Sequence, residues 1–176
     1  MGAASYFDDM AKAKSQAGGQ YVKGEGKFLV TIQRIFVHEG HKGRFFICEF
    51  SVDESTSPLD PAGSTRSWSA PLLGERAKYS FGDIKNLIFA VTGHHPKDVA
   101  DPDLNPELHN EATRLVMAAV DPAYAKKNDL DATILIGEQV QLETNLKATR
   151  PKPGQTQGGT FTVHSWSPAS AGEAVA

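Results

Sequence analysis

The segment Lys27-Phe-Leu-Val-Thr-Ile-Gln-Arg-Ile-Phe-Val-His38 is rich in β-branched and aromatic residues and contains neither proline nor glycine. This composition is typical of a β-strand. The segment is followed by Glu39-Gly-His-Lys-Gly43 and then by a second run, Arg44–Glu54, in which apolar residues alternate. We therefore predict a β-hairpin with a five-residue loop.

The alternation in the second run predicts which side chains face the core. Successive side chains of a strand point to opposite faces. One face carries Phe46, Cys48, Phe50 and Val52, and the other carries Phe45, Ile47, Glu49 and Ser51. We expect the first set to be buried and Phe45 to point outward. A long hairpin with apolar residues on both faces favours a strongly curved sheet that closes into a small barrel.

Three more strands are expected along the chain, at Thr65–Ala70, Ile134–Ala148 and Thr160–Trp166. In the first of these, Arg66 and Trp68 share a face. The second alternates cleanly from Val140 onward, which indicates a half-buried strand. The glycine- and proline-rich stretch 150–159 is predicted to be a flexible loop before the last strand.

Two helices are expected between the third and fourth strands. The first, Ser80–Thr92, places Ile84, Leu87, Ile88 and Val91 on one stripe and is followed by Gly93 as a left-handed stop. Ser80 and Asp83 have the spacing of a capping box. The second helix begins at the cap Asn105 and the first-turn residue Pro106, and it ends at Asp121-Pro122. Its expected inner face is formed by Leu108, Ala112, Leu115, Val116 and Ala119. The charged stretch Ala123–Asp131 is read as a connector.

Three strands, a helical insertion and a final hairpin is the order of the OB-fold. We therefore predict a mainly β protein, a five-stranded Greek-key β-barrel with two helices between strands 3 and 4. Residues 1–20 are expected to form a flexible N-terminal arm, residues 21–168 the domain, and residues 169–176 a disordered tail.

Composition limits the classes of protein. The 176 residues are 40% hydrophobic, which suffices for one core, and the net charge of -3 shows no overall basic excess. The lone cysteine, Cys48, is expected to be a buried apolar residue, and a chain with one cysteine forms no internal disulfide, which fits a reducing cytosol. No apolar run is long enough to span a bilayer. We expect a protein of the cytoplasm, or of the host cytoplasm if the chain is viral, with no membrane partner.

The sequence offers no enzyme constellation. It lacks the Gly-x-Ser-x-Gly elbow, the Walker loop and the Gly-x-Gly-x-x-Gly fingerprint. We expect no catalysis, no cofactor and no metal. An enzyme with a metal site built across loops from His38, His41, His94 or His95 remains the weakest of three hypotheses.

Aromatic rings interleaved with cations are the remaining chemical signal. Single-stranded nucleic acid is bound by flat rings that stack on bases and by cations that follow the phosphates. In an OB-fold, strands 2 and 3 and the loops after strands 1 and 4 form the usual binding face. The candidate nucleic-acid-binding residues on those elements are Arg34, Lys42, Arg44, Phe45, Arg66, Trp68, Lys147, Arg150 and Lys152.

Some aromatic residues have a structural alternative. Trp68 and Trp166 are large enough to be core residues, and core and platform are equally open for both. Six phenylalanines are expected in the core rather than on a platform: Phe28, Phe36, Phe46, Phe50, Phe81 and Phe161. Phe45 is the aromatic residue that the alternation places outward.

The layout resembles that of phage-type single-stranded-DNA-binding proteins with an OB-fold. The resemblance is one of pattern over residues 21–168, and it is carried by segments around Gly26–Ile32, Gly43–Asp53, Arg66–Trp68, Phe81–Gly93, Ile136–Val140 and Gly159–Pro168. It implies a non-enzymatic protein that coats single-stranded DNA in phage replication or recombination, with replication or recombination proteins as further partners. Many proteins of this type end in an acidic tail, whereas this chain ends Ser170-Ala-Gly-Glu-Ala-Val-Ala176, which puts tail-mediated recruitment in doubt.

The alternative class is a structural or assembly protein of the virion type, which would use a β-barrel for contacts between proteins. Such a protein forms a defined oligomer and shows no salt-sensitive binding to single strands. The sequence does not set the oligomeric state.

Overall fold

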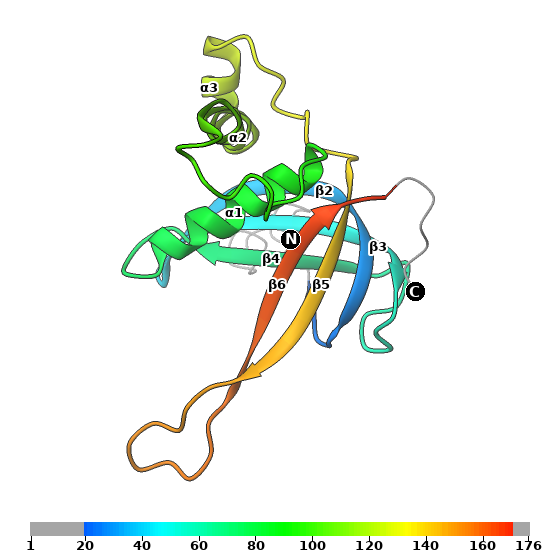
Figure 1. Cartoon of the computed structure of the whole chain (residues 1–176), viewed down its shortest axis with the longest axis vertical. Helices are drawn as coiled ribbons and strands as arrows, with labels where there is room; N and C mark the ends of the chain where they lie inside the picture. The colour runs from blue at the N-terminus through cyan, green and yellow to red at the C-terminus, as the bar shows by residue number, and fades with distance from the viewer. Residues whose placement is uncertain (1–19, 171–176) are drawn as a thin grey trace, which may run out of the picture.

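The computed structural model of the chain describes residues 20–170 and shows a mainly β protein with three helices (Figure 1). The strands are β1 (Gln20–Tyr21), β2 (Gly26–Gly40), β3 (Gly43–Ser55), β4 (Thr65–Pro71), β5 (Gln139–Ala148) and β6 (Thr160–Pro168). The helices are α1 (Ala77–Val91), α2 (Pro106–Val120) and α3 (Pro122–Lys127). The predicted strands and both predicted helices are present, with the helices between the third and fourth long strands.

The hairpin of β2 and β3 is tighter than predicted. Gly40 pairs with Gly43, so the connection is the two-residue turn His41-Lys42 and not a five-residue loop. Gly43 has a φ of 120°, a region that glycine enters without steric cost. Toward the tip, β2 therefore extends two residues beyond the predicted end at His38, and β3 starts one residue before the predicted start at Arg44.

The strand β2 bends because it pairs with two partners. It pairs with β3 from Phe28 to Gly40, and its first part, from Gly26 to Thr31, also pairs with β5. The β2–β3 register shifts between Leu29 and Val30 and again between Ile32 and Arg34. Such irregularities bend a strand and increase its twist, which lets the sheet curve over its own inner face.

The sheet has the order β1-β4-β3-β2-β5-β6, and its five long strands are antiparallel. No hydrogen bonds pair β4 with β6 in the part of the chain that the structure describes, so the sheet is open. Figure 1 shows β5 and β6 crossing in front of β3 and β4. The ring of Trp68 on β4 packs edge-on against that of Trp166 on β6, with centroids 5.6 Å apart. The two ends of the sheet therefore meet through side chains.

The core lies inside this curve. The four β3 residues predicted to face inward, Phe46, Cys48, Phe50 and Val52, are buried as expected. Ile84, Leu87 and Ile88 of α1 are buried in the same cluster, as the helical stripe predicted. Among the six phenylalanines assigned to the core, Phe28, Phe46 and Phe50 are fully buried, and Phe36 is half-buried.

The assignment is wrong for the other two. Phe81 is 52% exposed and Phe161 is 49% exposed. Leu146 of β5 is also exposed, because β5 runs beyond the core toward the loop at 149–159.

The helix α1 begins one turn before the predicted start. Ser80 is inside the helix, where its hydroxyl donates to the carbonyl oxygen of Arg76 at 3.2 Å, so the predicted capping box is absent. The predicted stop is confirmed: Gly93 has a φ of 86°, and the N–H of His94 donates to the carbonyl of Phe89 at 2.7 Å. This is the glycine-terminated helix end that satisfies the last carbonyls.

The helix α2 has the predicted bounds and inner face, with Ala112 and Leu115 buried. The following connector contains the short helix α3, which the sequence analysis missed. The carboxylate of Asp121 caps α3 by accepting from the N–H groups of Ala123 and Tyr124. The strand β5 begins at Gln139 and not at the predicted Ile134, and the residues from Ile134 to Gly137 form turns.

The predicted N-terminal arm lies outside the described residues except for Gln20, which belongs to β1 and pairs in parallel with β4. Of the predicted tail, residues 171–176 also lie outside them. Among the described residues, no helix combines the length and the hydrophobicity needed to cross a membrane.

Candidate nucleic-acid interface

The outer face of the β2–β3 hairpin carries aromatic rings beside cations. The guanidinium of Arg34 lies over the ring of Phe36, 4.3 Å from its centroid. Phe45 is half-buried on the same outward side of β3, opposite His38 on β2 and Pro71 on β4. Phe45 therefore points away from the core, as the alternation predicted.

The turn of this hairpin supplies two more of the candidate cations. Lys42 and Arg44 are exposed, and Arg44 forms an ion pair with Glu39. An exposed pair of this kind contributes at most about 1 kcal/mol, so it leaves Arg44 able to exchange partners. We call Arg34, Phe36, Lys42, Arg44 and Phe45 the hairpin surface.

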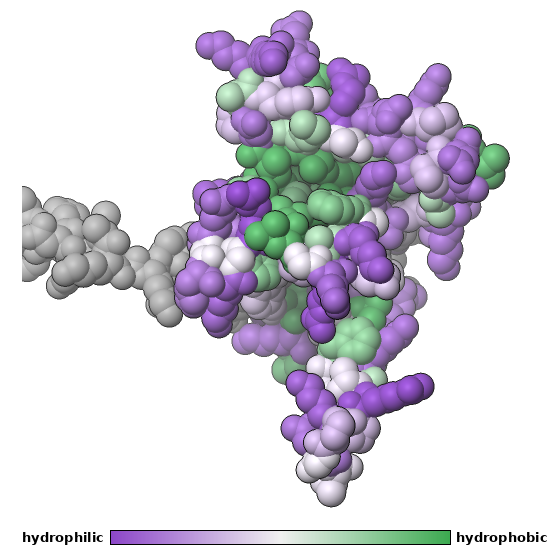
Figure 2. All heavy atoms as spheres, turned by 90° about the vertical axis from the view of Figure 1, so that its left-hand side faces the viewer, coloured by the Kyte–Doolittle hydropathy of each residue, from purple (hydrophilic) through white to green (hydrophobic). Residues whose placement is uncertain are grey.

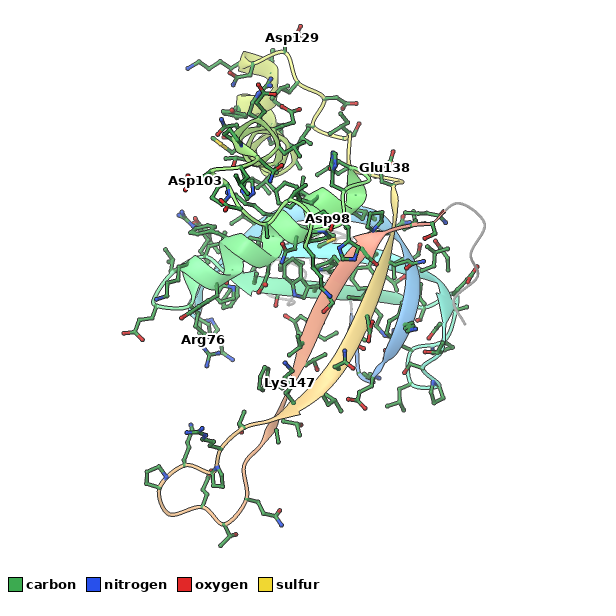
Figure 3. The ribbon with its side chains drawn as sticks, viewed as in Figure 1. Arg76, Asp98, Asp103, Asp129, Glu138 and Lys147 are labelled. Atoms are coloured by element: carbon green, nitrogen blue, oxygen red, sulfur yellow. The ribbon has the colours of Figure 1, made fainter. Side chains whose placement is uncertain are left out.

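The β5–β6 hairpin forms a separate basic element. We call residues 147–161 the arm; Figure 1 shows it projecting from the sheet, and Figure 3 labels Lys147 at its base. Lys147, Arg150 and Lys152 are all exposed. Residues 144–170 contain no aspartate or glutamate, so these cations have no acidic neighbour along the chain.

Arg66 does not belong to an exposed surface, contrary to the prediction. Its Nε donates to Asp60 Oδ1 at 2.5 Å, and the Asp60 side chain is 0% exposed. The other oxygen of Asp60 accepts from the backbone N–H groups of Lys23 and Gly24, both at 2.9 Å. Arg66 thus neutralises a buried carboxylate that ties together the loop before β4 and the segment before β2. The alternation correctly put Arg66 on the face of Trp68, but that face is the inner one.

Trp68 is a core residue and not an exposed platform. Its side chain is 5% exposed, and its ring packs edge-on against Phe46 and Trp166. Trp166 is buried as well, with its ring edge-on to Phe50. Both open alternatives are thereby decided in favour of the core.

A cleft opens between the last part of β4, the start of α1 and β6. It has a volume of about 510 Å³. It is lined by Trp68, Ser69, Ala70, Pro71, Arg76, Tyr79, Ser80, Asp83, Phe161, Thr162, Val163 and His164. Arg76 and Tyr79 are not among the predicted site residues, and Phe161 was predicted to lie in the core. A signal existed for Phe161: once Trp166 is placed in the core, alternation along β6 turns Phe161 to the opposite face.

Two titratable groups of the cleft are shifted by burial. Burial raises the pKa of the Asp83 carboxyl above its usual value. Burial also lowers the pKa of His164 to about 4, because the charged imidazole loses the hydration that stabilises it in water. His164 is therefore neutral at physiological pH.

An apolar groove of about 450 Å³ lies between the β2–β3 hairpin, α1 and α2. Its lining includes Val37, Leu72, Phe81, Val116 and Met117. Figure 2 shows hydrophobic side chains gathered on this side of the molecule, below the end where α2 and α3 lie.

The hypothesis of a metal site finds no support in the part of the chain that the structure describes, where no three His, Cys, Asp or Glu side chains are placed to hold a metal. Cys48 is fully buried, and its burial raises the pKa of the thiol. It is the small apolar core residue that was predicted.

The nine candidate residues thus fall into three places. Four lie on the hairpin surface and three on the arm, while Arg66 and Trp68 lie in the interior. Comparison with known proteins adds no family: no family model matches the chain, and no curated protein matches it.

Proposed function

We propose that the chain is a non-enzymatic single-stranded-DNA-binding protein built on an OB-type barrel. The observation that carries the proposal is the arm, an exposed hairpin with three cations in a stretch without carboxylates. When such a segment binds a nucleic-acid strand, its cations replace the counterions condensed on the phosphates, and the release of these counterions favours binding. In a protein of net negative charge, a cationic projection attracts a polyanion to that part of the surface.

The barrel is supported by the order of the strands. Without the short β1, the sheet runs β4-β3-β2-β5-β6, with the helices between β4 and β5. A five-stranded OB barrel closes when the third strand meets the fifth. Here these strands are β4 and β6, and the edge-on contact of Trp68 with Trp166 joins them.

The hairpin surface supplies the stacking part of the proposal. Stacking needs a ring with one free face and is worth about 1–3 kcal/mol per base. Phe45 is half-buried, so its position is fixed by the sheet while part of its ring stays accessible. Arg34, held over Phe36, offers a second flat group to bases and a charge to phosphates.

The test is fluorescence anisotropy with a labelled oligo-dT probe of about 20 nucleotides. We expect wild-type protein to bind the probe, and Phe45→Ala to weaken binding about tenfold because one stacked base is lost. Leu104→Ala is the matched control, since Leu104 is 79% exposed and lies outside the hairpin surface and the arm. Equal affinities of Phe45→Ala and wild type would remove Phe45 from the interface.

The apolar groove favours a second candidate, an assembly protein whose groove takes up a second copy of this chain. Phe81 and Met117, both exposed in the groove, are large apolar side chains that association would cover. Sedimentation velocity distinguishes the two candidates. A defined oligomer that Met117→Glu dissociates, together with no shift of the oligo-dT probe, would favour assembly over DNA binding.

A further inference from the structure

The cleft lies between the hairpin surface and the arm. At one end, Pro71 lines the cleft and is the register partner of Phe45 on β3. At the other end, Phe161 lines the cleft and is the register partner of Lys147 on β5. A strand bound to both cationic parts therefore has a direct path through the cleft.

Two exposed rings line the cleft from different elements. Tyr79 on α1 is 67% exposed, and Phe161 on β6 is 49% exposed. The ammonium of Lys78 lies 4.9 Å from the centroid of the Tyr79 ring. Neither ring is needed to fill the core, whose β4–β6 junction is already closed by Trp68 and Trp166. Exposed rings beside cations are the side chains that bind unstacked bases.

One cationic and one acidic side chain, Arg76 and Asp83, line the cleft. Arg76 is exposed at the N-terminal end of α1, and the first turn of that helix contains no acidic residue. Figure 3 shows Arg76 and Lys147 on the side of the molecule between that helix end and the arm. The carboxylate that lines the cleft is Asp83, and burial raises its pKa above the usual value.

We infer that the cleft binds one nucleotide of the strand, with its base against Tyr79 and Phe161 and its phosphate at Arg76. This inference rests on the proposed function and names residues that the hairpin surface and the arm do not include. The volume of about 510 Å³ is in the range of small-ligand sites, about 300–1,000 Å³. Ser69, Ser80 and Asp83 also line the cleft, where the hydroxyl of Ser80 donates to the carbonyl of Arg76 and that of Ser69 to the hydroxyl of Tyr21.

The test compares two double variants against the oligo-dT probe. The cleft variant combines Tyr79→Ala with Phe161→Ala. Both side chains are exposed, so we expect the variant to keep the fold, and an unchanged thermal unfolding midpoint verifies this. We expect this variant to lose affinity about tenfold or more. The control pair is Leu59→Ala with Leu104→Ala, which removes two exposed apolar side chains outside the cleft. A probe carrying one 5-iodouracil is then irradiated, and cross-linked peptides are located by mass spectrometry.

Each outcome decides the inference. A loss of at least threefold in the cleft variant but not in the control, with cross-links at Tyr79 or Phe161, supports it. If wild type binds and the cleft variant binds within threefold of it, or if cross-links occur only elsewhere, the nucleotide site is overturned while the proposed function stands. If wild-type protein does not bind the probe at all, the proposed function fails and the nucleotide site fails with it.

Discussion

The side chain of Arg66 is held in the interior by a single buried acid. Its Nε is 2.5 Å from Asp60, which also accepts two backbone hydrogen bonds from the segment before β2. The pair therefore positions two loops at the start of β4. Removing one partner of such a pair leaves a buried charge without compensation, which costs more than the pair itself contributes.

We predict that Arg66→Ala destabilises the protein by about 3–5 kcal/mol, because the Asp60 carboxylate remains buried without its cation. Urea unfolding followed by circular dichroism measures this. Arg76→Ala is the matched control, since Arg76 is exposed and forms none of these bonds. A loss below about 1 kcal/mol for Arg66→Ala, the range of an exposed pair, would show that the Arg66–Asp60 pair is not buried in solution.

His164 predicts a dependence of stability on pH. Its pKa is lowered from the model-peptide value of 6.5 to about 4 in the folded state, so between these values the unfolded chain binds more protons. The free energy of unfolding is therefore unaffected by this group above pH 6.5, and it decreases as the pH falls from 6.5 toward 4. The full loss is about 3 kcal/mol.

Unfolding free energies of wild type and His164→Gln at pH 7 and pH 4.5 test this. The wild type should lose more stability on acidification than the variant, because the variant lacks the titrating group. An identical loss in both proteins would contradict the buried placement of His164 in the cleft.

At the scale of single residues, alternation was a good guide to orientation and a poor guide to exposure. It placed Phe46, Cys48, Phe50 and Val52 inside and Phe45 outside, as found. It also put Arg66 and Trp68 on one face, but which face is the inner one depends on how the sheet curves. The partner of Arg66 comes from a loop, and a loop residue has no periodicity that would reveal its contact.

The helix α1 shows how two glycines with similar space around them differ. An added Cβ at Gly82 or at Gly93 would meet nothing within 4 Å. Gly82 has helical backbone inside α1, whereas Gly93 has a φ of 86° just after its end. The difference between the two sites is therefore conformational and not steric.

We predict that Gly93→Ala destabilises the protein by about 1 kcal/mol, because alanine is strained in the left-handed region. Gly82→Ala should stabilise it by about 0.5–1 kcal/mol, because alanine is the better helix former. Thermal or urea unfolding of the two variants measures both signs. Effects of the same sign would contradict the assigned end of α1.

The arm predicts the salt dependence of binding. Each phosphate contact to a single strand contributes about 0.7 to the slope of log K against log salt. The triple variant Lys147→Gln, Arg150→Gln and Lys152→Gln should therefore reduce the slope by about 2. The control is Lys23→Gln, Lys126→Gln and Lys127→Gln, which removes the same charge from exposed positions elsewhere. An equal change of slope in both triple variants would mean that total charge, and not the arm, attracts the strand.

Elements with strong local signals were predicted well, and elements fixed by tertiary contacts were not. The position of α1 was predicted from the stripe of Ile84, Leu87 and Ile88 and from the stop at Gly93. Its first turn starts at Ala77 and has no side-chain cap, so the sequence gives no signal for that start. The helix α3 has only six residues, too few to show a periodic stripe. The predicted turn of the β2–β3 hairpin is too long, because strand pairing continues through residues that the composition assigns to a loop.

For the whole molecule, the order of the strands could be predicted from the chain. The sequence also predicted that the sheet closes into a barrel, whereas no backbone pairing joins β4 to β6 among the described residues, so the closed barrel stays a prediction. The meeting of β4 and β6 depends on how far β2 bends, and its bulges leave no clear mark in the sequence. The cleft with Tyr79 and Phe161 exists because that junction is joined by tryptophans and not by backbone pairing. A site formed at such a junction is not visible in any one segment.

We propose that the molecule attracts single-stranded DNA through a localised cationic surface and holds it by stacking. An anisotropy titration of labelled oligo-dT and of a duplex of equal length at a series of salt concentrations tests this. We expect saturable binding that is tighter for the single strand than for the duplex and that weakens steeply as salt rises. Absence of saturable binding at low salt, or equal affinity for the two probes, would contradict it.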